Sequence, residues 1–197
     1  MWVDSKGRSY TLEKPVAIKP GEPFQIKGNL MTNLFSELQD MVDAGVLTDY
    51  VVGGASAVLF YTEPFYTEDI DLYVVVPEAT SPFTPLEDIY GYARVKGWKI
   101  DKEHIYIAGE KVQFLPVFSE LVQGTVSHAA LFNVEGVDVK VASPEYLIAI
   151  LLSLGRPKDR AKLALLQSQA TIDERFLQEV LTQHGLLSRW KAYRHES

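Results

Sequence analysis

The sequence predicts an α+β fold, in which a mixed β-sheet is flanked by helices and followed by a helical C-terminal part. Two apolar runs, residues 46–52 and 72–76, are typical of buried core strands. Gly109-Glu110 and Glu135-Gly136 each separate two short β-like segments, as a hairpin turn does. From residue 143 onwards the pattern is helical, so helices follow the strands instead of alternating with them.

The N-terminal half is predicted element by element. Residues 1–28 contain scattered Gly and Pro and are expected to form an extended arm. Residues 29–44 have apolar side chains at helical spacing, and Gly45 ends that helix. The first core strand follows at 46–52, and the glycine pair after it leads into a helix to about residue 61.

Capping signals define the helices of the second half. Thr84, with Pro and Glu behind it at 85 and 87, predicts the start of a helix that runs to about Lys96. Thr171 with Glu174 predicts another start, and glycines at 155 and 185 predict helix ends. We therefore expect three parts: an arm at 1–28, a sheet core at 29–142 and a helical subdomain at 143–197.

Composition excludes several classes of protein. With 197 residues and 47% apolar content the chain can bury a substantial core. It has no cysteine, which excludes disulfides, thiolate zinc sites and thiol nucleophiles. No apolar run reaches the roughly 18 residues of a membrane span. The N-terminus lacks a basic-then-apolar signal pattern, so a cytoplasmic location is expected.

Charge is unevenly distributed along the chain. The net charge is −7, but residues 156–197 carry eight Lys/Arg against five Asp/Glu. The overall acidity argues against general DNA or RNA binding. The basic tail either faces an anionic substrate or is a solvated helical surface. Its basic and aromatic segment, residues 189–194, is expected to pack Trp190 onto the core.

Two carboxylates stand at the start of the second core strand. Because side chains alternate along a strand, Asp69 and Asp71 point to the same face, roughly 7 Å apart. Two such charges repel each other and are costly to desolvate. A divalent cation between them would remove that penalty, and Mg²⁺ prefers carboxylate oxygen. The alternative is that both are ordinary acids at a strand edge.

The glycine pair lies where the first core strand turns into a helix. Gly53 and Gly54 would let the backbone approach an anion closely, or they would form a tight turn without a ligand. Ser56 is not a hydrolase nucleophile, because Val58 stands where that motif needs glycine.

In order and spacing these residues resemble a known superfamily. Gly-Gly about 15 residues before Asp-x-Asp resembles the nucleotidyltransferase fold. P-E-Y-L-I-A at 144–149, followed by G-R-P-K-D at 155–159, is similar to bacterial minimal and abortive-infection-type nucleotidyltransferase domains. The resemblance covers roughly residues 48–170. It implies a nucleotidyltransferase-like mixed sheet and Mg²⁺-dependent transfer of a nucleoside monophosphate from an NTP to an RNA or protein hydroxyl. It also offers an antitoxin as one option for a partner.

The resemblance also implies roles for individual residues. Asp69 and Asp71 would bind Mg²⁺ and act in catalysis, and Gly53, Gly54 and Ser56 would hold the triphosphate.

The helical part would complete that site. Lys158 would bind the phosphates, and Lys158 and Asp159 would both belong to the catalytic residues. Taken without the resemblance, helix capping and solubility explain the same two residues.

Three positions depart from the pattern of related sequences. Phe65 stands where arginine is frequent, Ala55 where a hydroxyl is frequent, and Gln113 where a third carboxylate is usual. Asp138 is the nearest substitute as a metal ligand, although a surface strand acid would look the same. The alternative function is therefore a catalytically degenerate protein of this fold that binds a nucleotide or a protein partner.

Overall fold

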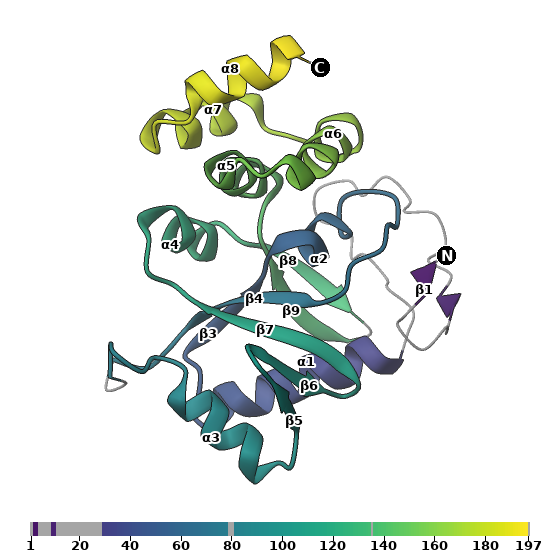
Figure 1. The fold of residues 1–197 in the computed structure, drawn as a ribbon, viewed down its shortest axis with the longest axis vertical. Coiled ribbons are helices and arrows are strands. Elements are labelled where there is room, and N and C mark those ends of the chain that lie inside the picture. Colours follow the sequence, from purple (N-terminus) through teal and green to yellow (C-terminus); the bar gives the residue numbers. More distant parts are fainter. Residues whose placement is uncertain (1, 4–8, 11–28, 79–80, 135, 197) are drawn as a thin grey trace.

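The computed structural model describes residues 2–3, 9–10, 29–78, 81–134 and 136–196. One seven-stranded sheet dominates it, with strand order β5-β6-β7-β4-β3-β9-β8 (Figure 1). Its strands are β3 (Asp49–Val52), β4 (Ile70–Val75), β5 (Lys99–Asp101), β6 (His104–Ile107), β7 (Glu110–Pro116), β8 (Ala130–Val134) and β9 (Val137–Val141). The predicted α+β class, with a mixed sheet, is confirmed.

Helices before, between and after the strands complete the fold. They are α1 (Asn29–Asp43), α2 (Gly54–Val58), α3 (Glu87–Val95), α4 (Glu120–Ser127), α5 (Pro144–Leu154), α6 (Arg160–Gln169), α7 (Glu174–Gln183) and α8 (Leu187–Glu196), with a 3₁₀ turn, η1 (Pro157–Asp159), before α6. Strands β1 (Trp2–Val3) and β2 (Ser9–Tyr10) pair with each other. The rest of the arm predicted for residues 1–28 lies outside the described residues.

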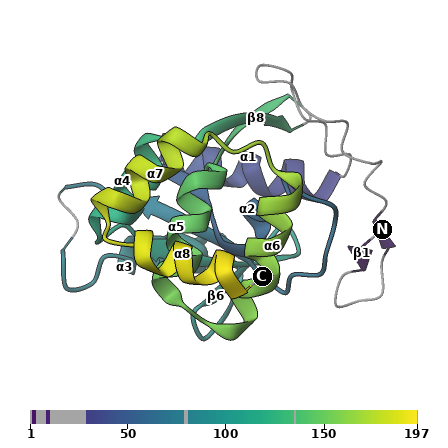
Figure 2. The same cartoon turned by 90° about the horizontal axis from the view of Figure 1, so that it is seen from above.

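The elements form layers around the sheet. α1 and α3 lie on one face, and α2 and α4 lie on the other (Figure 1). α5 packs on α2 and α4, and α6 to α8 lie beyond them, so this helical part covers the second face when seen from above (Figure 2). The predicted boundary at residue 142 falls between β9 and α5.

The centre of the sheet brings both predicted motifs to one edge. β4 is antiparallel to β3 and parallel to β7. The register pairs Val52 with Leu72, so the end of β3 and the start of β4 meet. Asp71 is paired with Gln113 of β7 at the same edge. The glycine turn and the aspartate pair therefore share one end of the sheet, on the face covered by α2.

Apolar periodicity built the core as expected. Leu34, Leu38 and Met41 of α1 are fully buried on one face of that helix. Leu72 and Val74 of β4 are also fully buried. Because these positions alternate with Asp71, the apolar face of β4 points away from the aspartates.

Three local predictions were displaced. Ile107 pairs with Glu110, so the first hairpin turn is Ala108-Gly109, both with positive φ, and not Gly109-Glu110. α3 begins at Glu87 instead of Thr84, because the Glu87 N–H bonds back to the Thr84 carbonyl in a single turn.

The N-cap of α7 is Asp173, not Thr171. Its carboxylate accepts a hydrogen bond from the Phe176 N–H at 3.0 Å. α4 and β5 were not predicted. Among the described residues, no helix has the length and apolarity needed to span a bilayer.

Candidate functional site

The two glycines of the turn after β3 are required by close packing against β4. Gly54 has a φ of 53°, in the left-handed region, and a Cβ there would collide with the carboxylate of Asp71. A Cβ at Gly53 would collide with the ring of Tyr73. The Gly53 N–H donates to the Asp71 carbonyl oxygen at 2.8 Å. The glycines thus leave the space in which the Asp71 side chain lies.

Ser56 fastens the same turn to the aspartate strand. Its hydroxyl donates to the Asp69 carbonyl oxygen at 2.9 Å, and the residue is buried. Thr67 donates to the same carbonyl at 3.1 Å. These bonds fix the backbone from which the Asp69 carboxylate projects.

Asp69 and Asp71 lie close enough to influence each other's charge. Burial, and then the negative charge of Asp69, raise the pKa of the Asp71 carboxyl. The charges of Lys162, Arg156 and His104 act in the opposite direction without cancelling this effect. A partly buried carboxylate beside a second one is an arrangement that a divalent cation would stabilise.

A cationic group from the helical part faces this pair. Arg156 donates to Asp159 through Nε at 2.6 Å and Nη2 at 3.2 Å, and Lys162 Nζ donates to it at 3.0 Å. Asp159 is 1% exposed. Burial alone would raise the pKa of the Asp159 carboxyl, but the bonds from Arg156 and Lys162 outweigh burial and lower it. Asp159 therefore holds two cations whose field reaches Asp71.

The remaining predicted residues, Lys158 and Asp138, are both exposed. Lys158 lies exposed in η1. The cations that the structure places on Asp159 are Arg156 and Lys162. Asp138 is exposed and accepts a hydrogen bond from the Asn133 side chain at 2.8 Å.

Register explains why Asp138 does not join the pair. Val141 of β9 pairs with Val52, and Asp138 is three residues earlier, roughly 10 Å along the strand. β9 is also separated from β4 by β3. The structure therefore does not bring Asp138 to the aspartate pair.

Gln113 occupies the place beside Asp71 on the next strand. A directly paired residue on a neighbouring strand presents its side chain to the same face. A neutral amide thus stands where a carboxylate would have joined the pair. Among the described residues, no group of three or more His, Asp or Glu side chains is arranged to hold a metal ion. Phe65 packs against the core.

Three site residues were missed by the sequence reasoning. Lys162 follows Asp159 by three residues, a spacing that places two side chains on the same side of a helix. This spacing could have indicated the contact between Lys162 and Asp159. Tyr73 follows Asp71 on the same face of β4, and burial, followed by the charge of Asp71, raises its pKa to about 12. His104 lies beside Asp69, and only strand pairing could have revealed that contact.

The donor set fits a divalent cation of the Mg²⁺ type. Asp69 and Asp71 offer carboxylate oxygens on one face, and burial, followed by the negative charge of Asp69, raises the pKa of Asp71. Two carboxylates leave most of the octahedral shell of Mg²⁺ for water and phosphate oxygens.

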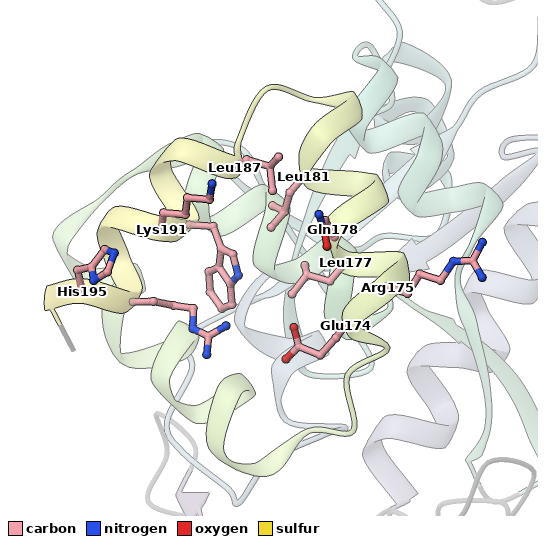
Figure 3. A pocket seen from close by; sticks show the side chains of 10 residues that line it. Glu174, Arg175, Leu177, Gln178, Leu181, Leu187, Lys191 and His195 are labelled. Carbon is pink, nitrogen blue, oxygen red and sulfur yellow. The ribbon is translucent and has the colours of Figure 1, made fainter.

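A separate hollow of about 680 Å³ lies between α7 and α8 (Figure 3). Leu177 and Leu181 lie along one side of α7, with Leu187 of α8 near Leu181, while Arg175 points away from α8 (Figure 3). Trp190, which also lines it, is 7% exposed and stacks on Tyr193. The expected packing of Trp190 onto the core is confirmed. The residues that line the hollow come from α7 and α8.

Comparison with known proteins gives structural matches only. No family model and no curated protein matches the chain. The solution structure of the antibiotic-resistance factor ANT(2'')-Ia has 17% identity and a TM-score of 0.54, over 84% of this chain and 96% of that one. A crystal structure of ANT(2")-Ia in complex with adenylyl-2"-tobramycin has the same identity and TM-score, over 84% of this chain and 98% of that one. An antigenic nucleotidyltransferase-like protein from Paracoccidioides brasiliensis has 18% sequence identity and a TM-score of 0.52, over 83% of this chain and 92% of that one.

Proposed function

We propose, from the premise that this chain has the nucleotidyltransferase fold, that it binds a magnesium–nucleoside triphosphate and transfers the nucleoside monophosphate to an acceptor hydroxyl. One observation carries the proposal. The Asp69/Asp71 pair lies against the glycine turn, and the field of Arg156 and Lys162 reaches it from the helical part. Negative and positive groups thus flank one place, as a metal-bound triphosphate requires.

In this proposal the carboxylates of Asp69 and Asp71 hold Mg²⁺. A cation bound there would neutralise phosphate charge and orient the triphosphate for in-line displacement. Gly53 and Gly54 contribute by leaving room beside Asp71, since the Gly53 N–H is already bonded to the Asp71 carbonyl. Ser56 positions the turn through its bond to Asp69, in place of the phosphate contact that the resemblance implies.

Arg156 and Lys162 would meet the negative charge of the phosphates. Both are held by the buried Asp159, so they are oriented before a nucleotide arrives. Preorganised cations of this kind stabilise charge that develops on the leaving group. Asp159 then acts through these two side chains, and Lys158 is a second, exposed candidate for phosphate contact.

The reaction consists of one substitution at phosphorus. The acceptor hydroxyl gives up its proton to solvent water as its oxygen bonds to the α-phosphorus, the bond from that phosphorus to the oxygen bridging to the β-phosphate breaks, and pyrophosphate leaves. The acceptors that we propose to test are RNA and protein hydroxyls. ANT(2")-Ia was solved with adenylyl-2"-tobramycin, which adds an aminoglycoside hydroxyl. An antitoxin partner stays a prediction.

The test is transfer of label from α-phosphate-labelled NTPs. Wild-type protein is incubated with Mg²⁺ and tRNA, the protein itself or tobramycin, and transfer is measured with and without EDTA. Asp69→Asn/Asp71→Asn should abolish transfer, whereas the matched control Asp138→Asn should retain it. Transfer that persists in the double variant would contradict the assignment.

A second candidate, a nucleotide binder without turnover, is favoured by one observation. Gln113 is paired with Asp71 where a third carboxylate would activate the acceptor hydroxyl. Two carboxylates suffice to bind one magnesium–nucleotide. Calorimetry that shows magnesium-dependent NTP binding, together with absence of transfer to every acceptor tested, would establish this candidate over the enzyme.

A further inference from the structure

A histidine stands at the end of a row of polar side chains that crosses three strands. Asp71 of β4 is paired with Gln113 of β7, and Gln113 is paired with His104 of β6. Directly paired residues present their side chains to the same face of a sheet. His104 therefore faces the side of the sheet on which the aspartate pair lies, and its imidazole Nε2 is 3.2 Å from Asp69 Oδ2.

The chemistry of this contact fixes its direction. An ionised carboxylate can only accept a hydrogen bond, so Nε2 of His104 carries the hydrogen and donates it to Asp69. The bond engages Oδ2 of Asp69 and leaves Oδ1 for another ligand. The other ring nitrogen, Nδ1, is 3.9 Å from Glu103, which is largely exposed.

The imidazole is well placed to hold a neighbouring group still. The His104 side chain is 12% exposed and that of Asp69 is 30% exposed, so a mostly covered ring restrains a more open carboxylate. The core positions of β6 are Ile105 and Ile107, both fully buried. Because Ile105 points to the opposite face, loss of the imidazole leaves the apolar core of this strand intact.

We propose that His104 is a positioning residue, which orients the Asp69 carboxylate for the cation through the Nε2–Oδ2 hydrogen bond. The inference rests on the proposed function, since it requires Asp69 and Asp71 to bind a divalent cation. Carboxylates that bind metals are themselves held by hydrogen bonds, and loss of such a partner costs about 10–100-fold in metal affinity or activity. His104 supplies such a bond to the Asp69 carboxylate.

The test measures metal binding directly, with Mn²⁺ as the probe. Free Mn²⁺ is followed by electron paramagnetic resonance during titration of the full chain, in the presence of a non-hydrolysable ATP analogue. His104→Ala should weaken Mn²⁺ binding about 10-fold. His104→Gln should recover most of the affinity, because its amide can donate from nearly the same place. His195→Ala, at an exposed position of α8, is the matched control and should bind as wild type does.

The outcomes separate the two levels of the proposal. If wild-type protein binds Mn²⁺ and His104→Ala binds it equally well, the positioning role is wrong and the proposed function stands. Equal losses in His104→Ala and His104→Gln would also overturn it, since the donor would then not matter. Absence of Mn²⁺ binding by wild type would overturn the proposed function itself, and this inference with it.

Discussion

The carboxylate of Asp71 lies against the backbone of Gly54, in space that any larger residue at position 54 would occupy. Two constraints therefore coincide at Gly54, its positive φ of 53° and the contact with a site residue. The glycine turn and the aspartate strand are interlocked and do not merely lie near each other.

Replacing Gly54 with alanine should displace the Asp71 side chain. We expect a loss of stability of roughly 1–3 kcal/mol from strain and overpacking, with a loss of divalent-metal binding. Chemical denaturation and Mn²⁺ titration would measure both effects. Gly91→Ala in α3 is the matched control: a Cβ there meets nothing within 4 Å, and helix propensity should make that variant slightly more stable.

Asp71→Asn should stabilise the metal-free protein. Because the pKa of Asp71 is raised in the fold, the native state binds a proton more readily than the unfolded state. As the pH rises from the ordinary Asp pKa to the raised pKa, Asp71 lowers the stability of the folded state progressively. Above the raised pKa this destabilisation is complete. We expect the melting temperature at neutral pH to rise by roughly 2–4 °C, if about 1 kcal/mol is recovered.

Mg²⁺ should make wild-type protein more stable than Asp71→Asn, the reverse of their order without metal. Wild-type protein should gain melting temperature with Mg²⁺ because the cation binds the folded state alone, whereas Asp71→Asn should gain none. Asp138→Asn should behave as wild type does. An Asp71→Asn variant with an unchanged response to Mg²⁺ would remove Asp71 from the metal site.

Asp159→Asn should have the opposite effect on stability. The bonds from Arg156 and Lys162 lower the pKa of Asp159, so its carboxylate stabilises the fold above the ordinary Asp value. This contribution is lost as the pH falls through the lowered pKa. Breaking a buried ion pair costs about 3–5 kcal/mol. Urea denaturation at neutral pH should show a lower free energy of unfolding for Asp159→Asn than for wild type. An unchanged free energy of unfolding would mean that Arg156 and Lys162 do not depend on Asp159.

Lys162 and Lys158 offer a matched pair of substitutions. Lys162→Gln should weaken NTP binding about 10-fold, equivalent to loss of one charge-assisted hydrogen bond, because the field of Lys162 reaches the aspartate site. Lys158→Gln, on an exposed side chain, should have less than about a 2-fold effect. Fluorescence titration with a labelled nucleotide would compare them, and a larger loss in Lys158→Gln would return the phosphate-binding role to Lys158.

Alternation and spacing were sufficient to predict the centre of the site. The period of two along β4 placed Asp69 and Asp71 on one face, and the glycine pair marked the turn beside them. These features are local in sequence, and a single apolar run identified each strand.

Contacts that depend on pairing between strands or helices could not be predicted in the same way. His104 reaches Asp69 only because β6 pairs with β7, and Asp138 is distant only because of the register of β9. Lys162 contacts Asp159 from the first turns of α6, and that contact depends on how η1 leads into the helix. The proposed ligand set is therefore local, while its supporting residues are set by the tertiary fold.

The most direct test of the account is calorimetric titration of the protein with ATP, GTP, CTP and UTP, with Mg²⁺ and with EDTA. We predict micromolar binding of at least one NTP in Mg²⁺, lost in EDTA and in Asp69→Asn/Asp71→Asn but retained in Asp138→Asn. Binding that is indifferent to Mg²⁺ and to both aspartates, or no binding of any NTP, would contradict the claim that Asp69 and Asp71 form a magnesium–nucleotide site.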